Sequence, residues 1–204
     1  MDKTITDPLP QSFYLDPPIT CARALLGKLV VHEIAGQRVS GIITEAEAYD
    51  GEDDLACHAR SGKTARNALL YGAPGIAYIY FTYGLHWLLN AVTRAEGEPA
   101  AVLIRAVEPF EGIDYIAHRR ESQPRRLWCN GPAKLTRALG IDGSQHGLPL
   151  YDPASPLRIE PGIETTPGII HSGPRVGIDY APEPWRSIPW RLWVSPKDLP
   201  LLKA

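Results

Sequence analysis

The stretch "GIAYIYFTYGLHWLLNAVT", residues 75–93, says most about how this chain folds. It is rich in aromatic and β-branched residues, which favour strands, and it has a single break at Tyr83-Gly84. The pattern predicts a β-hairpin with Tyr83 at or near its tip. Because side chains alternate along a strand, Tyr78 and Tyr80 are expected to share one face of the hairpin.

The segments on either side of this hairpin predict further strands and short helices. The expected strands are 29–34 ("LVVHEI"), 38–49 ("RVSGIITEAEAY"), 100–109 ("AAVLIRAVEP"), 175–180 ("RVGIDY") and 190–194 ("WRLWV"). The expected helices are 19–28 ("ITCARALLGK"), 63–72 ("KTARNALLYG") and 130–140 ("NGPAKLTRALG"). Thr20 and Asn130 are candidate N-caps, Pro132 falls in a first turn, and Gly140 is a stop signal.

The length and composition fit one globular domain. The chain has 204 residues, of which 44% are hydrophobic and 22% charged, and its 20 prolines disfavour long helices. We therefore expect an α+β fold over residues 1–204, with a mainly antiparallel, curved sheet, short helices and a protruding hairpin. Residues 1–18 are Pro- and Asp-rich and are expected to be irregular.

The sequence favours a cytoplasmic protein. Its start, "MDKTITDPLP", lacks the apolar core of a secretory signal, and no apolar run has the length of a membrane span. Cys21, Cys57 and Cys129 are far apart, which indicates reduced thiols. Cys57 next to His58 suggests a metal pair or a nucleophile, but no second Cys/His pair completes a zinc pattern, so no metal is expected.

Basic residues gather in two places although the net charge is −2. One stretch contains Arg119, Arg120, Arg125, Arg126, Lys134 and Arg137, and a shorter one contains Arg60, Lys63 and Arg66. Such clusters are compatible with a phosphate-binding face, and equally with ordinary solvated side chains. Charge alone leaves both interpretations open.

An acidic window, "TEAEAYDGEDD" at 44–54, is compatible with a solvated loop, a metal site or one working carboxylate. Alternation along a strand places Glu45, Glu47 and Tyr49 on one face. The window fits a calcium loop poorly, since no late Glu closes a twelve-residue loop. We expect "DGEDD" to be a solvated turn, and Glu45 and Glu47 either to face solvent or to supply a general base.

Aromatic rings crowd the region near these carboxylates. They are Tyr49, Tyr78, Tyr80, Tyr83, His58 and Trp87. Aromatic strands are usually core, but buried Tyr hydroxyls need partners and a hairpin tip offers no core. Flat rings, a carboxylate and flanking cations together suit the handling of an extruded nucleobase. Arg105, inside an apolar run, is expected to meet a carboxylate.

The sequence resembles the alkyladenine (3-methyladenine) DNA glycosylase family, the monofunctional alkylpurine glycosylases of mammals and many bacteria. The resemblance covers nearly the whole chain. It is carried by "ARALLGKLV", "GIITEAEAYDGEDDLACHARSGKTARN", "AYIYFTYGLHWLLN", "VLIRAVEP", "NGPAKLTRALGI" and "RVGI". The segment around "TEAEAY" and the Y-x-Y-x-x-Y-G hairpin are its most specific parts. No helix-hairpin-helix signature is present.

The resemblance implies catalytic roles for three residues. Glu47 lies where the family has its general base. Arg105 and the backbone carbonyl of Val176 lie where the family holds the attacking water. The implied reaction is hydrolysis of the N-glycosidic bond of alkylated or deaminated purines, such as 3-methyladenine, 7-methylguanine and hypoxanthine. It would leave an abasic site without strand cleavage and would need no cofactor.

The resemblance also implies how damaged DNA is held. Tyr49, His58 and Tyr80 match the residues that sandwich the flipped base. Asn90 matches a pocket residue that helps to reject undamaged guanine. Tyr83 and Leu85 match residues that insert into the DNA stack where the base has left. Arg60, Arg66 and Lys134 are the candidates for phosphate contacts. The expected partner is double-stranded DNA. The protein is expected to act as a monomer, and no membrane is expected to take part. Asp179-Tyr180 replaces a Gly-His pair of the family, which bears on substrate range.

Two other function classes are weighed against this one. A non-catalytic module that binds damaged DNA would use the same rings, but the presence of both Glu47 and Arg105 argues against it. An unrelated fold-mate, such as a formyltransferase-like domain, is disfavoured by the tyrosine hairpin. Release of free base from alkylated DNA distinguishes the enzyme from the binding module.

Overall fold

A curled, antiparallel sheet of eight strands forms the centre of the computed structural model, which describes residues 7–199. The strand order is β3-β4-β5-β2-β1-β6, and β8, which pairs with β7, joins the sheet at β2. The strands are β1 Leu29–Ile34, β2 Gln37–Asp50, β3 Ala77–Thr82, β4 His86–Val92, β5 Ala100–Glu111, β6 Leu157–Glu160, β7 His171–Gly173 and β8 Arg191–Trp193. The α+β prediction with a mainly antiparallel sheet is confirmed.

The long strand β2 organises the sheet because it pairs with three others. It pairs with β1 over its first half, with β8 near its end, and with β5 along most of its length. Register shifts next to Ser40 and on both sides of Glu45 bend the strand. Gly41 permits close approach of β5, since a Cβ there would lie 2.5 Å from Val107 Cγ2.

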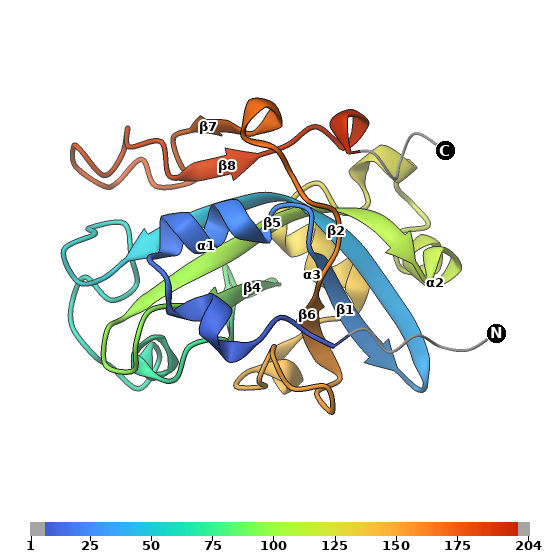
Figure 1. The fold of residues 1–204 in the computed structure, drawn as a ribbon, viewed down its shortest axis with the longest axis horizontal. Helices are drawn as coiled ribbons and strands as arrows, with labels where there is room; N and C mark the ends of the chain where they lie inside the picture. Colours follow the sequence, from blue (N-terminus) through green and yellow to red (C-terminus); the bar gives the residue numbers. More distant parts are fainter. Residues whose placement is uncertain (1–6, 200–204) are drawn as a thin grey trace.

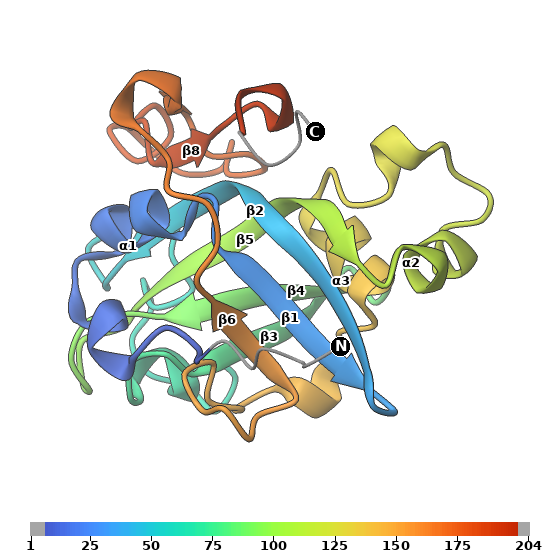
Figure 2. The same cartoon turned by 45° about the vertical axis from the view of Figure 1, so that its right-hand side comes forward.

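Three α-helices flank the sheet: α1 Pro18–Leu25, α2 Ile113–Arg119 and α3 Pro132–Leu139. In Figure 1, α1 crosses in front of the sheet and α3 lies behind it. Figure 2 separates α1, on the left, from α2 and α3, on the right. None of the helices within residues 7–199 has the length and apolarity that crossing a membrane requires.

The helix ends differ from the predicted caps. Helix α1 starts two residues before Thr20, after Pro17, and α3 is preceded by Gly131, so neither Thr20 nor Asn130 is an N-cap. Proline at the first helical position explains both starts, because its fixed φ suits a helix and its missing N–H needs no cap. Gly140 ends α3 as predicted, in the left-handed conformation with φ of 68°.

Two predicted elements are wrong, and the N-terminal segment, expected to be irregular, contains one short 3-10 turn. The helix expected at 63–72 is reduced to a 3-10 turn, η2 Ala68–Tyr71, and 175–180 is a loop instead of a strand. The N-terminal segment contains η1 Gln11–Leu15; residues 1–6 lie outside the described part. The remaining 3-10 turns are η3 Arg125–Leu127, η4 Gly143–Gln145, η5 Pro167–Ile169 and η6 Pro196–Asp198. The loop at 175–180 matters for the site, because it brings Val176 to β2.

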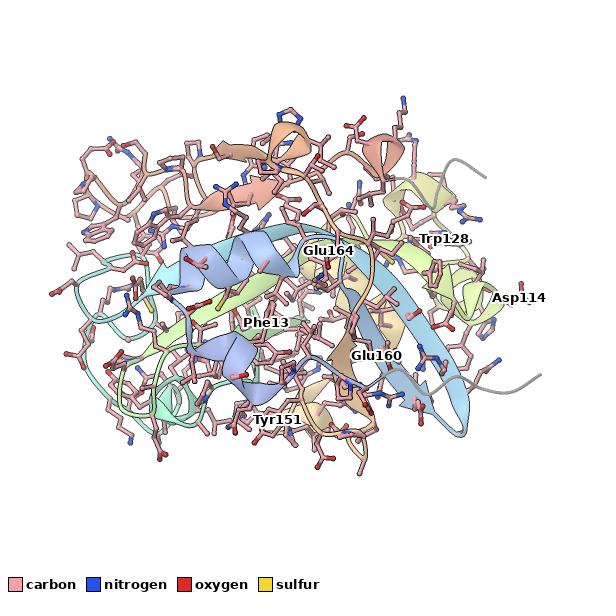
Figure 3. All side chains as sticks on the ribbon, in the orientation of Figure 1. Phe13, Asp114, Trp128, Tyr151, Glu160 and Glu164 are labelled. Atoms are coloured by element: carbon pink, nitrogen blue, oxygen red, sulfur yellow. The ribbon has the colours of Figure 1, made fainter. Side chains whose placement is uncertain are left out.

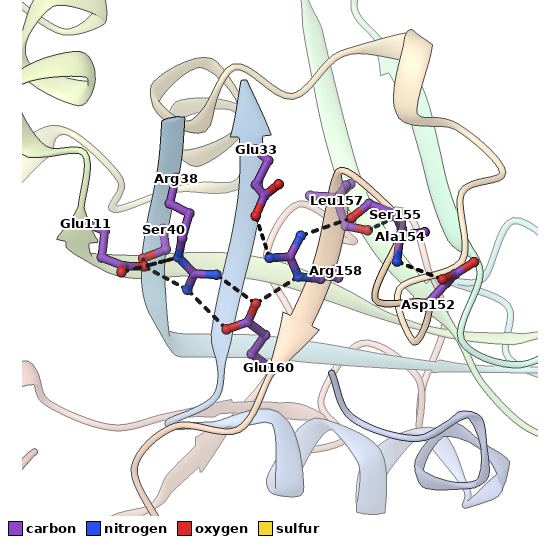
Figure 4. A network of polar contacts seen from close by, with 10 residues as sticks. All are labelled: Glu33, Arg38, Ser40, Glu111, Asp152, Ala154, Ser155, Leu157, Arg158 and Glu160. Atoms are coloured by element: carbon purple, nitrogen blue, oxygen red, sulfur yellow. Dashed lines mark hydrogen bonds and ion pairs between the residues drawn. The ribbon is translucent and has the colours of Figure 1, made fainter. Parts of the chain in front are cut away.

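Side chains pack against the faces of the sheet (Figure 3). A network of ion pairs holds the start of β2, the end farthest from Glu47 (Figure 4). Arg38 lies 3.0 Å from Glu111 and 2.9 Å from Glu160, which is almost fully buried. Arg158 lies 2.8 Å from Glu160 on the other side. The alternating charges give Glu160 two cationic partners, which offset the cost of burying its carboxylate.

Candidate active site

A cavity of about 360 Å³ opens between the end of β2, the β3–β4 hairpin and the loop at 175–180. Its lining includes most of the aromatic side chains singled out in the sequence. These are Tyr49, His58, Tyr78, Tyr80 and Tyr83, with Asn90, Arg105 and Val176 also at its surface. The cavity has room for a purine ring, whose flat faces such side chains can stack against.

One wall of the cavity consists of ring pairs in direct contact. The His58 and Tyr80 rings meet edge-on, with centroids 4.5 Å apart. His58 Nδ1 lies 3.1 Å from the hydroxyl of Tyr78, which fixes the imidazole plane. Burial, followed by the charges of Arg66 and Arg60, lowers the pKa of His58. The ring is therefore neutral at neutral pH and offers an aromatic face without a charge.

Glu47 is fully buried behind the cavity lining, with 0% of its surface exposed. Its carboxylate accepts the Tyr49 hydroxyl at 2.8 Å on Oε2 and the Val176 amide at 2.7 Å on Oε1. Arg105 Nη1 lies 3.3 Å from Oε2. Glu47 does not itself line the cavity, but these three partners do. A group that reaches Glu47 from the cavity must therefore pass between them.

Burial raises the pKa of Glu47, against the opposing effects of Arg105, the Val176 amide and the Tyr49 hydroxyl. Repulsion from Glu45 is the smallest of the contributions. Loss of water around the carboxylate dominates, which makes Glu47 a stronger base than a solvated carboxylate.

Glu45, beside Glu47, forms ion pairs with two arginines. Arg105 Nε donates to Glu45 Oε1 at 3.1 Å, and Arg191 donates to the same oxygen at 3.1 Å. The charges thus alternate from Arg191 through Glu45 and Arg105 to Glu47. The expectation that Arg105 meets a carboxylate is confirmed, since it meets two.

The prediction of a solvated turn at "DGEDD" is confirmed in part: Glu52 and Asp53 are exposed, whereas Asp50 is half-buried and Asp54 is buried. Asp50 forms an ion pair with Arg94 at 2.6 Å, and Glu52 accepts the Tyr71 hydroxyl at 2.6 Å. Asp54 is fully buried against another arginine. Asp50, Glu52 and Asp54 therefore each meet a different partner from elsewhere in the chain, which no local pattern reveals.

The arginine that binds Asp54 is Arg175, which sequence reasoning missed. Its guanidinium makes two hydrogen bonds to Asp54, of 2.5 and 2.9 Å, and lies 4.6 Å from the centroid of the Tyr49 ring. The one sequence feature that could have pointed to Arg175 was its position directly before Val176 in "RVGI". A charged residue inside a short motif gives no indication of burial until its partner is known.

Comparison with known sequences identifies the group of proteins to which this chain is related. A family model described as Methylpurine-DNA glycosylase matches residues 12–198. The chain belongs to that family. It is therefore a DNA glycosylase, a hydrolase of DNA repair, with DNA as its partner.

Curated relatives of this glycosylase agree along most of their length. A protein of Myxococcus xanthus is 45% identical over 91% of this chain and 89% of its own, and one of Bacillus licheniformis is 46% identical over 93% and 94%. A Chlamydia abortus protein is 44% identical over 93% of this chain and 100% of its own. Each carries the name "Putative 3-methyladenine DNA glycosylase".

The glycosylase's hairpin presents two apolar side chains to solvent at its tip. Tyr83 is 88% exposed with φ of 52°, and Leu85 is 73% exposed. Phe81 packs against Trp87 on the face opposite the cavity, with centroids 4.6 Å apart. Tyr83 is therefore not a core residue, as predicted, and its contact with DNA stays a prediction.

Asn90, on β4, lies at the floor of the cavity and is buried. Its Nδ2 donates to the carbonyl of Tyr78 at 3.0 Å across the hairpin. The part in rejecting undamaged guanine that the resemblance implies for Asn90 stays a prediction.

The three cations expected at DNA phosphates occupy different surroundings. Arg66 lines the cavity, and Arg60 lies 5.0 Å from the ring of Tyr180, which also lines it. Lys134, on α3, donates to Asn130 at 2.9 Å. None of the three forms an ion pair with a carboxylate in residues 7–199. Their charges are therefore not neutralised by the described part of the chain.

Cys57 lies in the cavity lining of this glycosylase, but its surroundings suppress reactivity. Burial raises the pKa of the thiol to about 11. The thiolate, which is the nucleophile and metal ligand, is therefore scarce at neutral pH. Within residues 7–199, no group of three His, Cys, Asp or Glu side chains is arranged to hold a metal ion.

Proposed function

We propose that this glycosylase hydrolyses the N-glycosidic bond of alkylated or deaminated purines in duplex DNA, the class of 3-methyladenine, 7-methylguanine and hypoxanthine. The observation that carries the proposal is the buried carboxylate of Glu47 behind a ring-lined cavity, bound by Tyr49, Arg105 and Val176. The product is an abasic site with the DNA strand intact.

The cavity receives the damaged base after the nucleotide has rotated out of the duplex. His58 and Tyr80 act together as one wall, and Tyr49, from β2, is the opposite wall. Extruding a nucleotide costs a few kcal/mol, and stacking on aromatic rings returns about 1–3 kcal/mol per base. Damaged pairs are easier to open, so the balance favours damaged nucleotides.

Glu47 removes a proton from a water molecule that attacks the C1′ carbon of the sugar. Bond cleavage develops positive charge on the sugar, and the carboxylate stabilises that charge. Arg105 orients both the water and Glu47. The Val176 amide is already used by Glu47, so the Val176 carbonyl is the group of that residue left to hold the water.

The chemistry of the leaving base decides how much help it needs. A cationic base such as 3-methyladenine departs without a proton, whereas a neutral base such as hypoxanthine benefits from a general acid. Strand cleavage by glycosylases requires an amine that forms a Schiff base. None of the side chains that line the cavity in residues 7–199 is a lysine, which supports simple hydrolysis.

Incubation with methylated DNA, followed by chromatography of the released bases, tests this function. Wild-type protein is expected to release 3-methyladenine and 7-methylguanine and to leave heat-labile abasic sites without nicks. A parallel reaction in EDTA tests the expectation, made from the sequence, that no metal takes part. Binding of methylated DNA without any released base would reject the proposal in favour of a damage-binding module.

A further inference from the structure

Arg175 and Asp54 form an ion pair that is sealed from solvent beside the cavity. The side chains of both residues are 0% exposed, and neither lines the cavity. The guanidinium and carboxylate meet through two parallel hydrogen bonds. Because desolvation offsets most of the attraction in a buried pair, net stability alone does not explain its placement.

Arg175 ties together segments that are distant in sequence. Its Nη1 donates to the carbonyl of Ala48 at 2.9 Å, on β2 between Glu47 and Tyr49. Its Nη2 donates to the carbonyl of Trp185 at 3.2 Å. The guanidinium thus joins the strand that carries the proposed base to the loops that follow β7.

Asp54 fixes the loop on the other side of the pair. Besides Arg175, it accepts the amide of Asp50 at 3.2 Å and that of Ala56 at 3.0 Å. These two bonds shape the turn between β2 and His58, which belongs to the opposite cavity wall. The pair therefore connects the two walls of the cavity without touching its interior.

The Arg175 guanidinium also supports the Tyr49 ring. It lies 4.6 Å from the Tyr49 centroid and 5.3 Å from the Trp190 centroid. Planar guanidinium groups stack well on aromatic rings and resist rotation when two rings and a carboxylate hold them. This contact outside the cavity therefore acts on the Tyr49 ring together with the hydrogen bond from its hydroxyl to Glu47.

The Val176 amide depends on the same anchor, because Val176 follows Arg175 in the chain. That amide donates to Glu47 Oε1 at 2.7 Å. On the other side, the carbonyl of Pro174 accepts Arg191 Nε at 2.8 Å. The loop that delivers the amide is therefore held at Pro174 and at Arg175, and Arg175 makes its contact at Ala48, next to Glu47 on β2.

We propose that the Arg175–Asp54 pair is a positioning element for catalysis, which holds the Val176 amide on Glu47 and the Tyr49 ring in its wall. This inference rests on the proposed function. Neither residue touches substrate in this scheme, and each acts through the groups that do.

The proposal makes a specific statement about proton binding at Glu47. The groups that face this carboxylate are Arg105 on β5, Glu45 and Tyr49 on β2, Tyr80 on β3 and the Val176 amide. Of these, the Val176 amide and Tyr49 are held by Arg175. Loss of the amide bond removes a donor that favours the charged carboxylate, so the proton is released only at higher pH.

The test is single-turnover base release from methylated DNA across the acidic limb of the pH profile. Arg175→Met and Asp54→Asn are each expected to move that limb upward by about one pH unit, the scale of one hydrogen bond to a charged group. At acidic pH the rate then falls about tenfold, while the plateau at higher pH falls less.

Arg158→Met is the matched control. Arg158 is also buried and ion-paired, at 2.8 Å from Glu160 and 2.8 Å from Glu33, but at the far end of the sheet (Figure 4). It is expected to lower the melting temperature without moving the acidic limb. If Arg175→Met does not fold, Arg175→Lys, which keeps the charge but loses the two-pronged geometry, is measured instead, with an upward shift again expected.

The outcomes separate this inference from the function on which it rests. An unmoved acidic limb in folded Arg175 and Asp54 variants, with wild type active, overturns the positioning role alone. An equal shift in Arg158→Met overturns it too, since general loosening would then explain the effect. Wild type that releases no base overturns the proposed function, and the positioning role with it.

Discussion

At the scale of single residues, the site depends on the surroundings of Glu47. Two carboxylates leave β2 two residues apart, but only Glu47 is fully buried, whereas Glu45 is paired with Arg105 and Arg191. Burial raises the pKa of Glu47, which strengthens this carboxylate as a base. The distinction between two chemically identical side chains therefore comes from burial and from the number of arginines each meets.

Glu47→Gln tests the proposed general base. The amide keeps the shape of the side chain but neither accepts a proton nor stabilises positive charge on the sugar, so base release should fall about 100- to 10,000-fold. Binding to DNA with an abasic site, measured by fluorescence anisotropy, should change little. A parallel loss of binding would show that Glu47 supports the fold instead of the chemistry.

Glu45→Gln should act in the opposite direction to the Arg175 variants. Glu45 raises the pKa of Glu47 slightly and shares Arg105 with it. Without this negative charge, Glu47 should lose its proton at lower pH, and the acidic limb of base release should move down by less than about one pH unit. The rate at the plateau should stay within about tenfold of wild type. An upward shift would mean that Glu45 acts mainly by placing Arg105.

At the scale of elements, the β3–β4 hairpin lines the cavity with one face, packs rings against each other on the other face, and exposes its tip to solvent. Tyr78 and Tyr80 face the cavity, Phe81 and Trp87 pack on the other face, and Tyr83 extends beyond both. The tip is short, because β3 ends at Thr82 and β4 begins at His86. A ring there has too little protein around it to be buried.

Tyr83→Ala should weaken DNA binding and leave the fold intact. If the ring fills the vacated stack, its loss should raise the cost of the flipped state by about 1–3 kcal/mol. Excision of neutral lesions should slow most, and the melting temperature should hardly change. Tyr78→Ala is the contrasting variant, since this buried ring should cost about 3–5 kcal/mol of stability. Loss of stability in Tyr83→Ala with normal DNA affinity would place Tyr83 in the core.

A further prediction concerns Arg60, Arg66 and Lys134, none of which forms an ion pair within residues 7–199. Arg60→Gln, Arg66→Gln and Lys134→Gln should each lower the salt dependence of DNA binding by about one unit in the logarithmic slope, since each would release one counterion on contact with a phosphate. Arg186→Gln is the control, because Arg186 is exposed and paired with Glu183 at 2.9 Å. A variant with the wild-type slope identifies a residue that does not contact phosphate.

At the scale of the whole molecule, ionic networks fix the two ends of β2. The Arg38 network holds its start, and the Arg175–Asp54 pair, with the Arg105 chain of charges, holds its end. The hydrophobic core runs between them beneath α1 and α3. The cavity therefore has rigid support from charges, while the core supplies most of the stability.

The pH dependence of unfolding should report the Arg38 network. Burial acts to raise the pKa of Glu111, but hydrogen bonds from Arg38 and Ser40 outweigh it and hold the pKa below its ordinary value. A lowered pKa stabilises the folded state above the unfolded-state value of about 4.3, and this stability is lost as pH falls through the folded-state value.

Glu111→Gln should thus remove about 1 kcal/mol of stability at neutral pH and less in acid, measured by urea unfolding at several pH values. Glu183→Gln is an exposed control away from the network. The same loss for Glu111→Gln at every pH would mean that packing, instead of charge, explains the contribution of Glu111.

The sequence by itself determined the hairpin and the long strands, and it singled out many of the residues that line the cavity. Alternation and β-branched composition act locally, so 29–34 and the tip at Tyr83 were predicted correctly. The resemblance added roles for Glu47 and the surrounding rings, of which the structure brings Tyr49, His58 and Tyr80 to one cavity.

Only the tertiary structure decided how the charges pair. Asp54 lies 121 positions before Arg175 in the chain, and the Val176 amide reaches Glu47 across 129 positions. No periodic pattern encodes such contacts, because they depend on how the sheet curls and where the loops return. The burial that sets the pKa of Glu47, and the anchoring of both cavity walls by one buried ion pair, therefore arise only once the chain has folded.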